Sequence, residues 1–299
     1  MTEGYTFRQS ELKAFMGCRR SWALAYVRQL VLKRGGEKVG TADTGTMFHL
    51  GLEHHYRDGL HPRAGLDAWW GEQSEETHEK LAKNYRLAGI MLDGYQTEVV
   101  EQGEDARWKI VHVERRMTVP FATILGVPVS ITGKADLEVE DIDFGTRKIV
   151  DHKSVDGIKD ERQLQIDFQG LTYATLRRME DDTRLTEFVH NQAKRVLRTG
   201  TAKPPFYGRT AVSFNDQQLR SHWKHMHAIL TEMVRLRQMV EAGDPLVEAM
   251  LYPNVTKDCS WKCSYLPVCP MMDDGSDAEG FLAQWYERSA TVETESEES

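Results

Sequence analysis

The stretch from Gly133 to Ser154 reads GKADLEVEDIDFGTRKIVDHKS and is the most informative part of the chain. Asp136 ends one apolar segment, while Asp151 and Lys153 lie two residues apart on the next. Residues i and i+2 of a β-strand face the same side of a sheet, so these two side chains are expected to project together toward Asp136. Two carboxylates and an ammonium can hold a divalent cation and keep a lysine beside the water that the cation activates.

The flanking residues favour buried strands over a surface turn, where most short Asp-x-Lys sequences lie. Apolar residues alternate with others from Val127 to Ile131, ahead of the first aspartate. Ile149 and Val150 lead directly into Asp151. A charge that is carried into a core needs a partner, and a bound cation is one.

Four short motifs stand in a fixed order along the chain. They are Gly45-Thr46-Met47-Phe48-His49, Gly133-Lys134-Ala135-Asp136-Leu137, Asp151-His152-Lys153 and Gln169-Gly170-Leu171-Thr172-Tyr173. Together they resemble the PD-(D/E)XK nuclease superfamily and, within it, the RecB-like branch that includes CRISPR-associated and phage exonucleases. The resemblance runs from Cys18 to Cys269. It implies an α/β fold with a restriction-endonuclease-like core, a mixed central sheet flanked by helices, an N-terminal helical region and a C-terminal cysteine-cluster segment.

The resemblance also implies roles for single residues. His49, in an apolar helix, would be the imidazole ligand of the cation, and Glu114 would lie near the same cluster. Gln169 and Tyr173, one turn apart on one helix face, would stand near the bound water or the scissile phosphate. Without the resemblance, structural roles would be the better interpretation of His49, Gln169 and Tyr173.

The implied chemistry is hydrolysis of DNA phosphodiester bonds by a water on Mn²⁺ or Mg²⁺. Asp136, Asp151 and His49 would hold the cation, and the nitrogen ligand makes manganese more acceptable than an all-oxygen site would. Lys153 would orient the water or help deprotonate it, and would offset charge in the transition state. The expected enzyme is an exonuclease that acts on single-stranded DNA or on exposed duplex ends.

The chain has four cysteines: Cys18, Cys259, Cys263 and Cys269. No secretory signal precedes them, so reduced thiols are expected. Four thiolates suit a zinc ion and a 4Fe-4S cluster equally, and the residue types leave both open. The resemblance favours the iron-sulfur cluster over zinc, since RecB-like members with one upstream and three downstream cysteines hold such a cluster as a clamp. Three residues separate Cys259 from Cys263, where many members have two.

Hydrophobic periodicity predicts the order of helices and strands. We expect one helix from Arg8 to Leu32 with Cys18 inside it, helices over 44–102, strands between Trp108 and Val155, a helix from Asp160 to Met179, strands at Phe188–Leu197 and Thr210–Phe214, and a helix from Asp216 to Glu241.

The 299 residues, 40% of them hydrophobic, can build one full α/β core, and no apolar run is long enough to cross a bilayer. The expected organisation is one nuclease domain over 1–286, with a helical region at 44–102, a catalytic core at 108–240, a metal-cluster clamp at 18 and 259–269, and a disordered acidic tail at 287–299. The expected location is the cytoplasm of a bacterial, archaeal or phage-infected cell, with no membrane partner.

The net charge of −8 does not argue against binding DNA. Residues 271–299 contain nine acidic residues and one basic residue, so residues 1–270 sum to zero. Basic clusters such as Arg115 with Arg116, and Lys194 to Arg198, are candidates for a DNA path, although most such clusters are solvated surface.

Two other functions are considered. One is a non-catalytic iron-sulfur or zinc module that binds DNA or a partner in recombination or CRISPR adaptation. The other is a metal-dependent hydrolase that acts on nucleotides or RNA. The intact set of Asp136, Asp151, Lys153 and His49 favours a nuclease. No phosphate-binding Gly-x4-Gly-Lys-Ser/Thr loop is present, so unwinding would need a helicase, recombinase or CRISPR adaptation partner.

Overall fold

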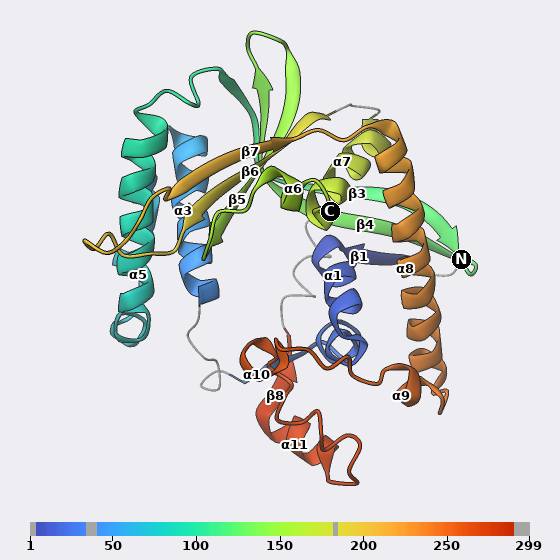
Figure 1. The fold of residues 1–299 in the computed structure, drawn as a ribbon. Helices are drawn as coiled ribbons and strands as arrows, with labels where there is room; N and C mark the ends of the chain where they lie inside the picture. Colours follow the sequence, from blue (N-terminus) through green and yellow to red (C-terminus); the bar gives the residue numbers. More distant parts are fainter. Residues whose placement is uncertain (1–3, 34–40, 182–184, 290–299) are drawn as a thin grey trace. The chain divides into compact units, whose positions relative to one another are not determined.

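A computed structural model describes residues 4–33, 41–181 and 185–289 (Figure 1). The chain divides into two compact units. The larger unit comprises Val39–Val119 and Thr132–Trp223, and the smaller unit comprises Met1–Lys38, Pro120–Ile131 and Lys224–Ser299. The single nuclease domain expected from the sequence stays a prediction.

The helices and strands of the described chain come mostly in runs of one kind. In order they are β1 (Tyr5–Arg8), α1 (Gln9–Gly17), α2 (Arg19–Trp22), the π-helix η1 (Ala23–Val27), β2 (Leu30–Leu32), α3 (Thr41–Asp58), α4 (Pro62–Gly71), α5 (Glu75–Tyr95), the π-helix η2 (Gln96–Val100), β3 (Trp108–Ile124), β4 (Val127–Asp141), β5 (Thr146–Val155), α6 (Glu161–Leu164), α7 (Phe168–Asp181), β6 (Leu185–Lys194), β7 (Tyr207–Val212), α8 (Asp216–Ala242), α9 (Val247–Met250), α10 (Cys259–Lys262), α11 (Ala278–Trp285) and β8 (Tyr286–Arg288).

The main sheet has six strands and is mixed. Its order is β1-β4-β5-β6-β7, and β3 also pairs with β4. β5 and β6 run parallel, while β4–β5 and β6–β7 are antiparallel. Helices flank this sheet (Figure 1), so the predicted α/β class with a mixed central sheet is confirmed.

The predicted strands between Trp108 and Val155 form three consecutive strands, β3, β4 and β5. Leu125 and Gly126 join β3 to β4 with φ of 48° and 81°. Two central residues with positive φ are typical of the type I′ turn, whose twist matches that of the strands it joins. The alternating apolar residues from Val127 to Ile131 are buried, as predicted.

Both faces of β5 are buried in the larger unit. Val150 packs with Phe48 and Leu92 of the helical region, whereas Ile149 packs with Tyr173 and Phe188. Successive strand residues point to opposite faces. Continuing this alternation along β5, Asp151 and Lys153 share the face of Ile149, and His152 shares the face of Val150.

The predicted single helix from Arg8 to Leu32 is wrong. α1 ends at Gly17, and Cys18, expected inside the helix, is extended with φ −159° and ψ 116°. The segment ends in β2, in which Leu30 pairs with Arg288 of β8. Amphipathic spacing indicates burial, but it cannot separate a continuing helix from a strand whose partner lies at the other end of the chain.

The predicted helix from Asp160 to Met179 is divided into α6 and α7. Asp160 caps α6 by accepting a 3.0 Å hydrogen bond from the N–H of Gln163. Asp167 accepts a 2.9 Å bond from the N–H of Gly170 at the start of α7. Two capping aspartates produce two helix starts.

The other predicted elements lie close to their expected positions. The helical region at 44–102 is confirmed as α3, α4, α5 and η2, and the long helix from Asp216 is confirmed as α8. β6 and β7 each begin three residues earlier than expected, at Leu185 and Tyr207. None of the described helices is both long and apolar enough to span a bilayer.

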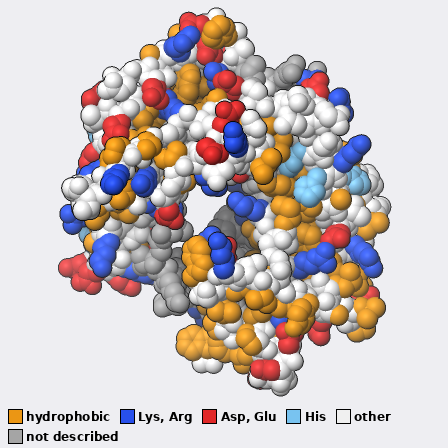
Figure 2. All heavy atoms as spheres, viewed as in Figure 1, with side chains coloured by type: hydrophobic (Ala, Val, Ile, Leu, Met, Phe, Trp, Pro, Cys, Tyr) orange, Lys and Arg blue, Asp and Glu red, His pale blue; other side chains and the backbone are white. Residues whose placement is uncertain are grey.

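The C-terminal segment, residues 243–289 of the smaller unit, buries few side chains. Large apolar residues stay exposed, among them Tyr252, Val255 and Trp261. Figure 2 shows hydrophobic side chains gathered at the surface in the part of the view where Figure 1 places α10 and α11. The expected acidic tail began at residue 287, but Glu287 and Arg288 belong to β8, and residues 290–299 lie outside the described residues.

Candidate metal centre

The two aspartates lie where β4 and β5 stop pairing with each other. Their register runs from Asp141↔Thr146 to Leu137↔Val150. Immediately beyond it, the N–H of His152 donates to Oδ2 of Asp136 at 2.8 Å. A side-chain carboxylate has thus replaced a strand carbonyl as acceptor, which holds Asp136 beside β5.

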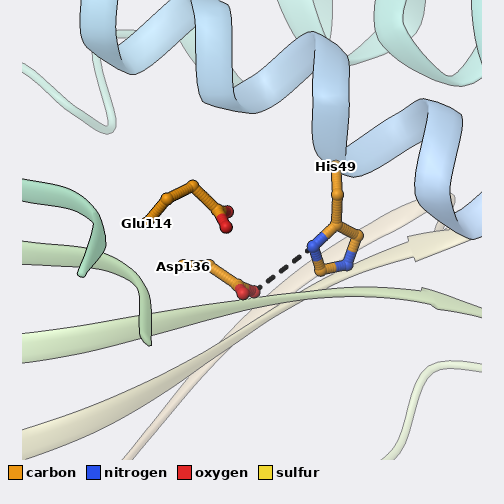
Figure 3. A group of neighbouring side chains, drawn as sticks. All are labelled: His49, Glu114 and Asp136. Atoms are coloured by element: carbon orange, nitrogen blue, oxygen red, sulfur yellow. Dashed lines mark ion pairs between the residues drawn. The ribbon is translucent and has the colours of Figure 1, made fainter. Parts of the chain in front are cut away.

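Three predicted ligands from three elements converge at this point (Figure 3). His49 of α3, Glu114 of β3 and Asp136 of β4 each offer one ligand atom within 4.8 Å of the other two. Nδ1 of His49 lies 3.5 Å from Oδ2 of Asp136. Residues far apart in sequence are therefore brought to one small volume.

Glu114 has a backbone conformation that glutamate rarely adopts. Its φ is 54°, in the left-handed region, although it lies within a strand. Its carboxylate forms an ion pair with Lys134 and points toward Asp136 (Figure 3). Strained backbone of this kind concentrates at functional sites, where surrounding structure maintains it.

Asp151 has one satisfied oxygen and one without a partner. Oδ1 accepts hydrogen bonds from Nζ of Lys153 at 2.8 Å and from Nε2 of Gln169 at 2.9 Å. Oδ2 is buried and has no hydrogen-bond partner in the described part of the chain. A buried carboxylate oxygen without a partner is costly, by roughly 1–3 kcal/mol or more. A divalent cation would supply the missing partner, although the 4.8 Å group does not include Asp151.

The site favours a cation electrostatically. Burial, and then the negative charge of Asp151, raise the pKa of Asp136 to about 8. Burial, and then the charge of Lys153, lower the pKa of His49 to about 4, so its imidazole is neutral with a lone pair to offer. One nitrogen and several carboxylate oxygens, one of them unpartnered, fit Mn²⁺ or Mg²⁺.

Lys153 carries a positive charge at neutral pH. Burial alone would lower its pKa, but the negative charges of Asp151 and Asp136 outweigh burial, and the pKa of Lys153 is raised. Its ammonium is held on the carboxylate of Asp151, beside the predicted ligands. The arrangement suits charge stabilisation better than proton abstraction.

Helix α7 is fixed against the strands by polar side chains one turn apart. Gln169 holds Asp151, and the hydroxyl of Tyr173 donates to the carbonyl of Lys134 at 2.8 Å. A Cβ at Gly133 would lie 2.6 Å from Cε1 of Tyr173, so only glycine admits the ring there. Burial, and then the charge of Asp151, raise the pKa of Tyr173 to about 12, so its hydroxyl stays protonated and holds the strand.

Two groups near the site were not singled out from the sequence. The N–H of His152, the middle residue of the Asp-x-Lys motif, fixes Asp136. His190 pairs in register with Asp151 on β6, and its Nε2 is buried without a partner among the described residues. The available signal for His190 was the polar run from His190 to Gln192, which directly follows the apolar pair Phe188 and Val189 in a predicted strand.

The four cysteines lie in the smaller unit, and none forms a disulfide. Burial raises the pKa of the Cys263 thiol, a hydrogen bond from the N–H of Tyr265 opposes this, and the other three cysteines add to the rise. The thiol of Cys263 therefore interacts electrostatically with the other three thiols. Other groups donate to two of the sulfurs: the N–H of Thr256 to Cys259 at 3.4 Å, and Nη1 of Arg20 to Cys269 at 3.6 Å.

A family model described as the PD-(D/E)XK nuclease superfamily matches residues 6–270. The match covers most of the chain, and the protein belongs to this nuclease superfamily. No curated protein matches the chain.

Two solved structures are similar to this chain. One is a predicted exonuclease from Eubacterium rectale, 16% identical over 80% of this chain and 82% of that one, with a TM-score of 0.48. The other is SSO0001, 12% identical over 90% of this chain and 88% of that one, with a TM-score of 0.44. At such low similarity neither supports a statement about function, and the family membership rests on the family model.

Proposed function

We propose that the protein is a divalent-metal-dependent deoxyribonuclease of the RecB-like branch, an exonuclease acting on single-stranded DNA or exposed duplex ends. The observation that carries this proposal is the convergence of His49, Glu114 and Asp136 within 4.8 Å, beside an Asp151 whose Oδ2 lacks a partner among the described residues. Such a site, in a member of a nuclease superfamily, fits phosphodiester hydrolysis.

Each residue has a defined part in this chemistry. A bound Mn²⁺ or Mg²⁺ would polarise the phosphoryl oxygen and lower the pKa of its water. His49, Glu114, Asp136 and Asp151 would hold the cation. Lys153 would offset the charge that develops on the phosphate, because its ammonium is already held in place by Asp151.

Gln169 and Tyr173 support the reacting groups. Gln169 keeps Asp151 Oδ1 engaged, which leaves Oδ2 for the cation. Tyr173 holds the strand residue Lys134, two positions before Asp136. Both roles orient the ligands before substrate binds, which is how positioned polar groups lower a barrier.

We further propose that Cys18, Cys259, Cys263 and Cys269 hold a structural 4Fe-4S cluster in a cytoplasmic protein. Four thiolates suit a zinc ion and a 4Fe-4S cluster equally. The order of one upstream and three downstream cysteines, which resembles RecB-like nucleases that hold such a cluster, supports the iron-sulfur cluster over zinc.

Digestion of end-labelled DNA tests the catalytic proposal. Wild-type protein should release nucleotides from single-stranded DNA or duplex ends with Mn²⁺ and none with EDTA. Lys153→Ala should lower the rate by about 10²–10³-fold, the typical loss for one charge-stabilising donor, with Mn²⁺ affinity largely kept. Lys148→Ala is the matched control, since Lys148 lies on the same strand and pairs with Asp141 and Glu187.

Three results would contradict the proposal. Cleavage by Lys153→Ala at the wild-type rate would remove Lys153 from the mechanism. Cleavage of RNA or nucleotides but not DNA would favour a different metal-dependent hydrolase. Binding of DNA without cleavage would favour a non-catalytic module that works with a helicase, recombinase or CRISPR adaptation partner.

Metal analysis tests the cluster. Protein purified without oxygen should be brown and contain about four irons per chain, as a 4Fe-4S cluster requires. A colourless protein with one zinc per chain would replace the cluster with a zinc site.

A further inference from the structure

A connected set of aromatic and hydrogen-bond contacts adjoins the candidate metal centre in the larger unit. Tyr56 stands two turns after His49 on α3, and its ring stacks on the imidazole of His152, with centroids 5.5 Å apart and planes 5° from parallel. The rings of His49 and His152 are 6.1 Å apart. The backbone of His152 in turn donates to Asp136. Helix α3, which carries the predicted ligand His49, therefore packs against His152, and the backbone of His152 fixes the predicted ligand Asp136.

The hydroxyl of Tyr56 enters a buried polar network. It lies 2.7 Å from the hydroxyl of Tyr95 and donates to Oδ2 of Asp105 at 2.8 Å. Nη2 of Arg209 donates to Tyr56 at 3.1 Å, and Arg209 pairs with Asp105. The two tyrosines are buried, so each hydroxyl needs these partners.

Asn191 closes the network onto His152. Its Oδ1 accepts from Nε of Arg209 at 3.2 Å, and because a guanidinium only donates, this contact fixes the orientation of the amide. Nδ2 then lies 2.9 Å from the hydroxyl of Tyr95 and 2.8 Å from Nδ1 of His152. An amide nitrogen only donates, so Nδ1 of His152 accepts and the ring carries its proton on Nε2.

We propose that Tyr56, Tyr95, Asn191 and Arg209 are positioning residues, which hold α3 and His152 in the one arrangement that brings the metal ligands together. The proposal rests on the proposed function, since it concerns the ligands of that site. Tyr56 and Asn191 act on His152 directly, and Tyr95 and Arg209 hold those two. Through His152 they set the 3.5 Å separation of His49 and Asp136.

The expected effect is on metal affinity as well as on stability. Groups that orient metal ligands without touching the metal typically change its affinity by about 10–100-fold when removed. A network that only stabilised the fold would lower the melting temperature and leave the affinity of the folded protein unchanged. The two roles therefore differ in a measurable quantity.

Mn²⁺ titration of the full-length protein separates them, at a temperature where circular dichroism shows every variant folded. Tyr56→Leu and Asn191→Leu should each raise the Mn²⁺ dissociation constant by about 10–100-fold. Tyr56→Phe keeps the stacked ring and should recover most of the affinity. Tyr207→Phe is the matched control, because the Tyr207 hydroxyl bonds Met91 and Arg198 outside this network. It should lower stability alone. Wild-type affinity in folded Tyr56→Leu and Asn191→Leu would overturn the proposal.

The imidazole of His152 gives a readout that needs no metal. Long-range ¹H–¹⁵N NMR spectra, assigned with a His152→Phe variant, should show His152 protonated on Nε2 in the wild type, and Asn191→Leu should shift its Nδ1 signal. If the wild-type protein binds no Mn²⁺, the proposed function fails, and these spectra decide the network alone. A His152 protonated on Nδ1 would overturn it.

Discussion

The sheet core of the larger unit and the C-terminal segment of the smaller unit are stabilised differently. The sheet core buries apolar side chains on both faces of β5, and it also buries the hydrogen-bonded set of Tyr95, His152 and Asn191. The C-terminal segment has a cluster of five buried residues, Leu24 with Tyr265, Val268, Leu282 and Tyr286, and leaves Val255 80% exposed. It also carries three of the four cysteines. Where apolar burial is sparse, bound metal can supply folding free energy.

The largest expected effect is the loss of one cysteine. Cys18→Ser should destabilise the C-terminal segment by several kcal/mol, since structural metal binding contributes about 10–16 kcal/mol in small zinc domains. Amide hydrogen exchange should become fast over residues 252–286 and stay slow in β4, β5 and β6. Met16→Ser, at an exposed position of α1 two residues before Cys18, is the control. Equally fast exchange in both regions would show that the C-terminal segment and the sheet core are not stabilised independently.

The second effect is local to the sheet core. Gln169→Leu removes one donor to Asp151 Oδ1 and should lower Mn²⁺ affinity or cleavage by about 10–100-fold, with the fold retained. Gln165→Leu is the control, because the side chain of Gln165 donates to the exposed side chain of Glu161. Isothermal titration and cleavage rates measure the difference. Equal losses in both variants would show that the effect comes from the α6–α7 junction as a whole.

The third effect tests how tightly the sheet core is packed. Gly133→Ala would place a methyl group 2.6 Å from the ring of Tyr173, and overpacking of this kind costs about 1–3 kcal/mol. Gly157→Ala meets no atom within 4 Å and should be near neutral. Urea denaturation of the two variants measures the difference. A neutral Gly133→Ala would mean that Tyr173 can move aside, so that the Gly133 and Tyr173 motifs are not coupled.

The smallest effect separates strain from ligand chemistry. Glu114→Gly and Leu125→Gly each relieve a positive φ, a strain of about 1–2 kcal/mol for a non-glycine residue. The greater entropy loss of glycine on folding offsets about 0.5–1 kcal/mol of this gain, so each variant should be slightly more stable than the wild type. Only Glu114→Gly should also weaken Mn²⁺ binding, because Leu125 lies in a turn outside the metal centre. Melting curves with and without Mn²⁺ test both expectations. Unchanged Mn²⁺ affinity in Glu114→Gly would remove Glu114 from the ligand set.

Local sequence predicted the elements whose stability is local. The alternation ahead of Asp136, the approach to Asp151 and the long helix from Asp216 all placed elements correctly, because period 2 and period 3.6 directly reflect which side chains are buried. The prediction of one helix from Arg8 to Leu32 was wrong because the end of this segment is stabilised by a distant partner. Leu30 has the spacing of a helix, but its backbone pairs with Arg288, and no local pattern encodes a partner so distant.

The chemistry available to this protein follows from the sequence alone, which contains the carboxylates, the imidazole, the lysine and the four thiols. Only the tertiary structure decided their arrangement. It placed Asp136 where β4 stops pairing with β5. It holds Glu114 near Asp136 with a positive φ, and it stacks the Tyr56 ring on His152. The physical reason is that these contacts join residues from separate helices and strands. Their distances depend on packing and hydrogen bonds that no single segment contains.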